Sequence, residues 1–178
     1  MTTKLPSPTI LITPRLFLRP LQWGDEVALE GVFGDAEVMR FGDGVQNAAW
    51  IKAWLANQLA NDASLTGIRV WGVVEQETAK FIGYCGLFFM GNVNGREEVE
   101  IGYRLARPFW GQGYATEAAT AVRDYAFDTL HLPRLIALID PSNVASMRVA
   151  EKLGMVREAE VLLPGYTHPD WVYALSAA

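Results

Sequence analysis

The stretch Arg107–Ala118, which reads RPFWGQGYATEA, is the part of the sequence that decides the fold, because it places two glycines directly before a helix. Gly111 and Gly113 flank Gln112, and glycine accepts a positive φ and lets a ligand approach without a Cβ in the way. The first N–H groups of a helix lack intrahelical partners, and the helix dipole is positive there. We therefore expect an anion site suited to a diphosphate. A tight turn that only packs closely is the alternative reading of the same glycines.

The residues around these glycines argue against two specific nucleotide sites. The nucleoside-triphosphate loop needs a Gly-Lys-Ser/Thr ending, which the turn lacks. The dinucleotide fingerprint needs Gly or Ala at its sixth position, and here that position is Thr116. It also needs an acidic residue at the end of a second strand roughly 20 residues later, where this chain still has a helical pattern.

Hydrophobic periodicity assigns the rest of the chain to strands and helices. Strands are expected at about 15–21, 68–74, 81–90, 98–105, 135–139, 155–160 and 170–174, and helices at about 25–33, 48–61, 116–130 and up to 153. Asn47 should cap the second helix, Gly154 should follow the last one, and Gly91–Gly95 should form a turn. The strand, helix and strand around the glycine turn predict a parallel βαβ crossover. The fold class is therefore α+β or mixed α/β, in a single domain over residues 1–178.

Composition excludes several classes of function. The net charge is −5 and Lys and Arg occur without basic runs, which argues against nucleic acid and against an anionic membrane surface. Cys85 is the one cysteine and lies in an apolar run, so we expect a buried, inert thiol. One cysteine and two histidines are a poor set of metal ligands, and no metal is expected. The start MTTKLPSPTI lacks the apolar core of a leader, and no run of about 18 apolar residues exists, which predicts a cytoplasmic protein.

Blocks of sequence on either side of the glycine turn carry a family resemblance. Glu98–Ala118 (EVEIGYRLARPFWGQGYATEA), followed by Asn143–Met155 (NVASMRVAEKLGM), resembles the GNAT superfamily of N-acetyltransferases. The opening TPRLFLRPLQWGDEVAL and the closing HPDWVYALS are similar to the RimJ/RimL type, which acetylates the N-termini of ribosomal proteins. The resemblance implies a GNAT-like fold: a central mixed, mostly antiparallel sheet with flanking helices and one parallel pair that splays apart between Tyr103 and Ile139.

The resemblance also implies which residues bind acetyl-CoA, the expected co-substrate. The strand segment Tyr103, Arg104 and Leu105 should offer backbone groups to the pantetheine arm, and Asn143 should hydrogen-bond it. The pyrophosphate should be wrapped by Trp110, Gly111, Gln112, Gly113, Tyr114 and Ala115, with Thr116 in the first turn of the helix. Two positions depart from the family pattern. Pro108 stands where a Gln or Arg is frequent, with Arg107 as a substitute charge, and Ala150 stands where a Tyr often protonates the leaving thiolate.

Two side chains are candidates for the chemistry. An amine must be neutral to attack a thioester, and Glu100, on the polar face of its strand beside Gly102, is the candidate general base. The alternative is a solvated strand carboxylate like Glu97. Ser146, three residues after Asn143, is the candidate hydrogen-bond donor to the leaving sulfur, as in the RimJ/RimL type, although serine is also ordinary in a first helical turn.

Two further groups of residues bear on this chemistry. Backbone N–H groups at a bulge near 103–105 could stabilise the oxyanion. His168 and Asp170 are more typical of a solvated turn than of a substrate site. A core role is likewise more typical than a cleft role for the aromatic residues Trp50, Trp54, Trp71, Phe88, Phe89 and Trp171.

The predicted protein is an acetyl-CoA-dependent N-acetyltransferase, active as a monomer or homodimer. It would transfer acetyl directly, in a ternary complex, to a primary amine: a protein N-terminal α-amine or a small-molecule amine. A non-catalytic acyl-CoA-binding sensor is the alternative, since it would keep the glycine turn without needing Glu100.

Overall fold

Eight strands form one continuous sheet in the computed structural model, which describes residues 10–62 and 66–177. The strands are β1 (Leu11–Ile12), β2 (Leu16–Pro20), β3 (Val70–Glu75), β4 (Phe81–Val93), β5 (Arg96–Leu105), β6 (Arg134–Ile139), β7 (Val156–Val161) and β8 (Asp170–Ser176). They lie in the order β1-β2-β3-β4-β5-β6-β8-β7, and every neighbouring pair is antiparallel except β5 and β6. The predicted mixed, mostly antiparallel sheet with one parallel pair is confirmed.

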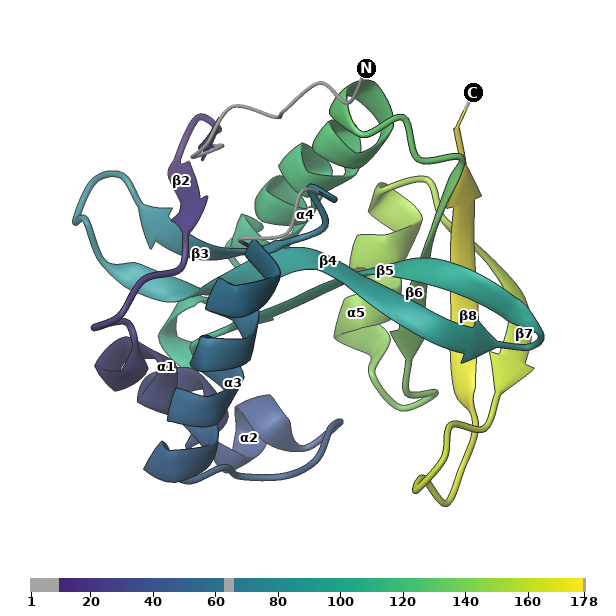
Figure 1. Cartoon of the computed structure of the whole chain (residues 1–178), viewed down its shortest axis with the longest axis horizontal. Helices are drawn as coiled ribbons and strands as arrows, with labels where there is room; N and C mark the ends of the chain where they lie inside the picture. The colour runs from purple at the N-terminus through teal and green to yellow at the C-terminus, as the bar shows by residue number, and fades with distance from the viewer. Residues whose placement is uncertain (1–9, 63–65, 178) are drawn as a thin grey trace.

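Helices cover both faces of this sheet (Figure 1). They are α1 (Glu26–Phe33), α2 (Ala36–Met39), α3 (Ala48–Asp62), a 3₁₀ turn (Arg107–Phe109), α4 (Tyr114–Asp124), a π-helical turn (Tyr125–Thr129) and α5 (Val144–Lys152). The first three gather together, away from α4 and α5 (Figure 1). Neighbouring residues of β4 show that the two groups cover opposite faces: Tyr84 packs in a cluster with α1 and α3, and Cys85 packs in a second cluster with α4. Among the described residues, none of these helices is long and apolar enough to cross a membrane.

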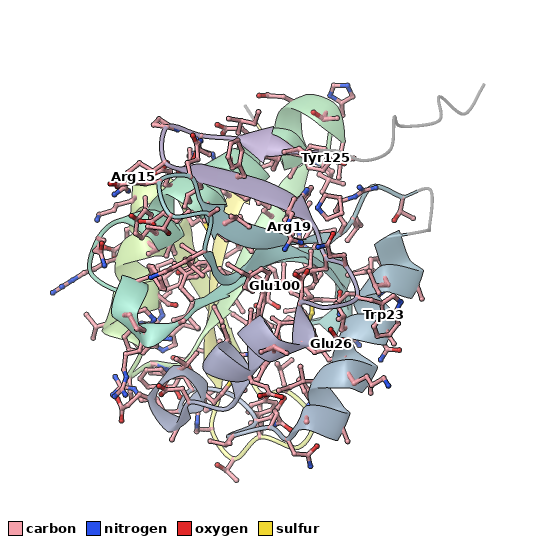
Figure 2. The ribbon with its side chains drawn as sticks, turned by 90° about the vertical axis from the view of Figure 1, so that its left-hand side faces the viewer. Arg15, Arg19, Trp23, Glu26, Glu100 and Tyr125 are labelled. Carbon is pink, nitrogen blue, oxygen red and sulfur yellow. The ribbon has the colours of Figure 1, made fainter. Side chains whose placement is uncertain are left out.

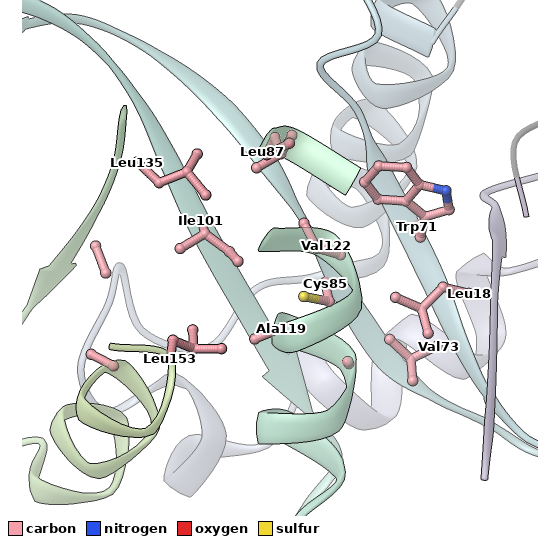
Figure 3. Close-up of a cluster of buried hydrophobic side chains, with 14 of the residues drawn as sticks. Leu18, Trp71, Val73, Cys85, Leu87, Ile101, Ala119, Val122, Leu135 and Leu153 are labelled. Atoms are coloured by element: carbon pink, nitrogen blue, oxygen red, sulfur yellow. The ribbon is translucent and has the colours of Figure 1, made fainter. Parts of the chain in front are cut away.

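The main core lies between α4 and the middle of the sheet (Figure 3). Trp71 and Val122 are fully buried in it, and the thiol of Cys85 is fully buried beside them. Small residues on the inner face of α4, Ala118 and Ala119, are also fully buried, which lets the helix approach the strands closely. The expectation of a buried, inert cysteine agrees with this position, because burial raises the pKa of the thiol and disfavours the reactive thiolate.

Most predicted element boundaries hold to within a few residues, and the caps are confirmed. The Asn47 side chain accepts from the Trp50 N–H at 2.9 Å, and Gly154 follows α5 with φ +86°. The predicted turn at 91–95 is too long, because β4 continues to Val93 and the tight turn uses only Asn94 and Gly95, both at positive φ.

Three features were not predicted from the sequence. The helix after the glycine turn begins at Tyr114 rather than at residue 116. The short strand β1 and the short helix α2 are new. Residues 1–9, whose composition carried the expectation of no leader, lie outside the described residues.

The parallel pair is the feature of the fold that positions a site. Strands β5 and β6 pair at a single register position, Glu100 opposite Ile136. Beyond this point each strand continues, β5 with β4 and β6 with β8, but the two no longer pair with each other. The sheet therefore splits just before Tyr103 and Ile139, as the resemblance implied.

Candidate active site

Glu100 lies at the point where the sheet splits, near the middle of the molecule (Figure 2). Its Oε1 atom accepts a hydrogen bond from the Leu138 N–H at 3.2 Å. That N–H belongs to β6 and faces β5, so the split leaves it without a strand partner. The carboxylate of Glu100 therefore bridges the two diverging strands, which is a more constrained position than the solvated strand carboxylate considered from the sequence.

Removal from water raises the pKa of Glu100 to about 7. The hydrogen bond from Leu138 and the positive charge of Arg104 act against this rise, and the negative charge of Asp170 adds to it. A carboxyl with this pKa exchanges its proton near neutral pH, which is the range a general base needs.

The backbone groups of β5 alternate between its two neighbours, and this decides which of them are open to the split. The Ala106 N–H donates to the Ile82 carbonyl of β4, so Arg104, two residues earlier and opposite Tyr84, also pairs its backbone with β4. The prediction that Arg104 offers backbone groups to the pantetheine is therefore wrong. Tyr103, by the same alternation, turns its backbone N–H and C=O toward the split. The expected bulge near 103–105 is also absent, since pairing with β4 is regular there, and β6 frees these groups by diverging.

Arg104 contributes its side chain to the face that carries Glu100. Its Nη1 atom donates to the Tyr84 hydroxyl at 3.1 Å. Between the two charged residues, Gly102 leaves room for the ring of Phe88, which lies 3.1 Å from where a Cβ would be. This face therefore combines a carboxylate, a guanidinium and aromatic side chains.

The glycine turn has the backbone geometry that an anion site requires. Gly111 and Gly113 have φ +72° and +82°, and a Cβ built at Gly111 would meet nothing within 4 Å. Gly113 is the N-cap of α4. In the described part of the chain, the N–H groups of Tyr114, Ala115 and Thr116 have no backbone acceptor, as expected for a first helical turn. The turn thus presents open space, free donors and a positive helix end.

Side-chain tethers fix the shape of this turn. The Trp110 indole Nε1 donates to the Leu105 carbonyl at 2.7 Å, and the Gln112 Nε2 donates to the Pro108 carbonyl at 2.9 Å. The Tyr114 ring is buried and its hydroxyl donates to Glu75 Oε1 at 2.6 Å. Trp110 and Tyr114 thus tie the turn to β5 and β3, and Gln112 bonds within the loop itself. Because these side-chain polar groups are already used, ligand contact at these residues falls mainly to the backbone.

The start of α5 lies on the other side of the split. Asn143 caps the helix, because its Oδ1 accepts from the Ser146 N–H at 3.2 Å. The Tyr103 hydroxyl donates to Ser146 Oγ at 3.3 Å, and burial raises the pKa of Tyr103, which keeps the phenol protonated. The sequence resemblance assigned Tyr103 only a backbone role. Its strand parity, shared with the inward-facing Ile101, was the signal that its ring points to this side.

Burial separates the aromatic residues named for the core or an acceptor cleft into those packed in a core and one that is exposed. Trp71 is fully buried in the main core, Trp50, Trp54 and Phe88 pack against the α1–α3 cluster, and Trp171 packs against the main core. Phe89 is 60% exposed. The core interpretation therefore describes all but Phe89.

Three residues near the end of β6 form a cluster that the sequence did not predict. His168 Nε2 lies 3.4 Å from Asp140 Oδ2, and Asp170 completes a group whose donor atoms lie within 4.8 Å of one another. Burial, with the nearby charge of Asp140, raises the pKa of Asp170. His168 and Asp170 thus belong to a charged group rather than to an isolated solvated turn. Asp170 also lies close enough to Glu100 for its negative charge to raise the pKa of that carboxyl, an effect that the positive charge of Arg104 opposes.

The residues at the split fit coenzyme A. The thioester-bearing arm is a chain of amides that needs backbone partners, and Tyr103 offers both an N–H and a C=O where β6 has diverged. The pyrophosphate is a dianion that needs N–H donors without a Cβ nearby, and the glycine turn offers these. An anion-binding helix start beside a split between parallel strands defines a class of enzymes, the acyltransferases that take their acyl group from coenzyme A.

The chain belongs to the GNAT acetyltransferase family. The family model described as an acetyltransferase (GNAT) domain matches residues 15–156. The protein is thus an acetyl-CoA-dependent acyltransferase that uses an amine acceptor. The comparisons bear out the GNAT resemblance seen in the sequence.

Individual relatives agree with this membership. The uncharacterized N-acetyltransferase p20 of Bacillus licheniformis is 34% identical over 149 residues, which cover 83% of each chain. The crystal structure of an acetyltransferase from Agrobacterium tumefaciens is similar with a TM-score of 0.80 and 32% identity, covering 95% of each chain. A Vibrio cholerae protein, provisionally assigned as a ribosomal-protein-serine acetyltransferase, is similar with a TM-score of 0.72 and 25% identity, covering 95% of this chain and 98% of that one.

Proposed function

We propose that this protein, working as one acetyltransferase domain, moves the acetyl group of acetyl-CoA directly to a primary amine in a ternary complex. The observation that carries the proposal is the split between β5 and β6, with the Glu100 carboxylate at its apex on the Leu138 N–H. Acetyl-CoA supplies the activated acetyl thioester. The residues of this chain hold it, accept a proton from the amine and donate a hydrogen bond to the leaving thiolate.

Glu100 acts as the general base, directly or through a water molecule. Its pKa of about 7 is close to that of an α-amine, at about 7.7–8.0, and far below that of a lysine side chain, at about 10.4. Proton transfer from an α-ammonium to Glu100 is therefore only slightly uphill, whereas transfer from a lysine ammonium is strongly uphill. This match favours acceptors with low amine pKa values, as protein N-termini have.

Ser146 donates a hydrogen bond from its hydroxyl to the leaving sulfur. The Tyr103 phenol donates to Ser146 Oγ, and this bond polarises the serine O–H toward its own acceptor. Ser146 also lies in the first turn of α5, where the positive end of the helix stabilises a developing negative charge. Tyr103 and Ser146 thereby compensate for Ala150, which is buried where many family members carry the acidic Tyr.

The donor is held by the turn and by the start of α5. Trp110, Gly111, Gln112, Gly113, Tyr114, Ala115 and Thr116 surround the pyrophosphate, with contact mainly through their backbone. The pantetheine lies along Tyr103 and the Leu105 N–H. The Asn143 side-chain amide serves it as a donor, because only its Oδ1 is used by the helix cap.

The acceptor belongs to the RimJ/RimL class, a protein N-terminal α-amine, with a small-molecule amine as the alternative. The provisional ribosomal-protein acceptor of the Vibrio cholerae relative supports this class. The acidic groups Asp140 and Asp170 beside the split also favour a basic acceptor, since amines arrive protonated. The chain would act without a metal, as a monomer or a homodimer.

The test combines donor binding with an acceptor screen. Thermal unfolding is followed with acetyl-CoA, coenzyme A and NAD. The melting temperature should rise with the first two ligands but not with NAD. Thiol release is then measured against N-terminal peptides of ribosomal proteins, aminoglycosides and polyamines. Turnover that depends on Glu100 supports the proposal. Stabilisation by NAD alone contradicts it, and tight acetyl-CoA binding without turnover of any amine would favour the acyl-CoA sensor.

A further inference from the structure

Arg15, in the turn between β1 and β2, contacts the glycine turn and the start of α4. Its side chain lies at the edge of the molecule, well away from Glu100 (Figure 2). The guanidinium donates from Nη1 to the Gln112 carbonyl at 2.9 Å and from Nε to Glu117 Oε2 at 2.6 Å. The central carbon of the guanidinium, Cζ, lies 4.4 Å from the centre of the Tyr114 ring. One side chain thus touches the turn, the first residue of α4 and the first turn of that helix.

Glu117 holds this guanidinium in place. Its carboxylate is only 15% exposed and accepts, besides the guanidinium, the Arg15 backbone N–H at 2.8 Å and the Thr13 hydroxyl at 2.6 Å. Thr13 and Arg15 form the turn between β1 and β2. Since α4 and this turn are about a hundred residues apart in sequence, the contact is a tertiary clamp and not a local cap.

The bond to Gln112 decides the orientation of the next N–H group. The Gln112 carbonyl and the Gly113 N–H belong to one planar trans peptide, in which C=O and N–H point in opposite directions. Because the carbonyl is turned toward Arg15, the Gly113 N–H is turned away from it. A φ of +82° at Gly113 is compatible with this orientation, and a Cβ there would lie 3.4 Å from Arg15 Nη2.

We propose that Arg15, held by Glu117, is a positioning residue for the donor: it fixes the Gln112–Gly113 peptide so that the Gly113 N–H faces the pyrophosphate of coenzyme A. The inference rests on the proposed function, which places the pyrophosphate at the glycine turn. The residue acts through the turn and touches neither the thioester nor the amine. Its effect is therefore confined to the part of the donor that carries the pyrophosphate.

The test compares two ligands that differ in that part. Coenzyme A contains the pyrophosphate and pantetheine lacks it. Dissociation constants are measured for coenzyme A by calorimetry and for pantetheine by ligand-observed NMR titration. Arg15→Gln should raise the dissociation constant of coenzyme A by about ten- to a hundredfold, which is the effect of losing one hydrogen bond with a charged partner. Pantetheine binding should stay within about twofold, because the lost bond acts only on the turn. Arg40→Gln, which removes another ion-paired arginine on an exposed helix end, should change neither constant.

Two further variants keep the test decisive if Arg15→Gln folds poorly. Arg15→Lys retains the charge but cannot donate to the Gln112 carbonyl and to Glu117 at the same time. It should therefore weaken the binding of coenzyme A to an intermediate extent. Glu117→Gln should do the same, and adding it to Arg15→Gln should cause no further loss, because both residues act in one clamp.

The failures of the two ideas are distinguishable. Three results would each overturn the role of Arg15. They are an equal loss of affinity for both ligands, additive losses of affinity in the double variant, and an unchanged dissociation constant for coenzyme A. If the wild-type protein binds coenzyme A no more tightly than pantetheine, the pyrophosphate site itself, and with it the proposed function, is wrong.

Discussion

Replacing Glu100 by glutamine should reduce activity and increase stability at the same time. The pKa of Glu100 is raised from its ordinary 4.5 to about 7 mainly because the carboxyl is removed from water. A difference of about 2.5 pH units, at about 1.4 kcal/mol each, corresponds to at most about 3.5 kcal/mol. Glutamine is nearly isosteric and its Oε1 can still accept from the Leu138 N–H, so the variant removes the charge and keeps the bridge.

The sign of the stability effect follows from the direction of the pKa shift. A carboxyl whose folded-state pKa is raised stabilises the fold below its unfolded pKa, near 4.5, and this contribution is lost as the pH rises through about 7. The free energy of unfolding of Glu100→Gln should therefore match that of the wild type near pH 4.5. Above pH 8 the free energy of unfolding of the variant should exceed that of the wild type by up to about 3.5 kcal/mol.

The activity effect has the opposite sign. With saturating acetyl-CoA and thiol release as the readout, wild-type kcat/KM for the amine should fall below about pH 7, as the base becomes protonated. Glu100→Gln should lose about 10²–10⁴-fold in kcat/KM, and the acid limb that remains should follow the pKa of the amine, about 7.7–8.0 for an α-amine, instead of that of Glu100.

Glu97→Gln, an exposed position on the same strand, is the matched control and should change neither quantity. Urea denaturation at the two pH values gives the stability difference. A variant that keeps the wild-type activity, or that is less stable than the wild type at pH 8, would refute the assignment of Glu100 as a desolvated base.

Other variants test the remaining parts of the site. Ser146→Ala should lower kcat by about ten- to a hundredfold and Tyr103→Phe by about threefold to tenfold, with KM for acetyl-CoA nearly unchanged in steady-state assays; a rise in KM alone would contradict their role at the leaving sulfur. Gly113→Ala should raise KM for acetyl-CoA and cost about 1 kcal/mol of stability, because alanine is strained at φ +82°; an unchanged KM would count against the turn as donor site. Cys85→Ala should remain active, and iodoacetamide should leave the native thiol unlabelled in a mass spectrum, since burial raises the pKa of Cys85; rapid labelling with loss of activity would refute an inert role.

The fold could be predicted from the sequence where local patterns and tertiary packing agree. The alternation in β5 and the glycine turn before α4 identified the parallel crossover, and Asn47 and Gly154 identified helix ends. The short elements β1 and α2 could not be predicted, because two to four residues carry no periodicity. The early start of α4 was also missed, since its N-cap is a glycine without a capping side chain.

The candidate site was predictable in its residues but not in their connections. The positions of Glu100 and Ser146 along the chain were visible in the sequence. That the Glu100 carboxylate meets the Leu138 N–H, and that the Tyr103 phenol meets Ser146, depends on where two strands diverge. The error over the backbone of Arg104 has the same origin, because strand parity assigns a residue to a face but register decides which neighbour its backbone bonds.

A crystal structure of the protein with acetyl-CoA bound tests the central claim most directly. The pyrophosphate should accept hydrogen bonds from backbone N–H groups between Gly111 and Thr116, and the thioester should lie in the split between β5 and β6, within reach of Glu100 and Ser146. A donor bound elsewhere, for example in the hollow between β1 and α4 lined by Ile12 and Thr120, would contradict the account.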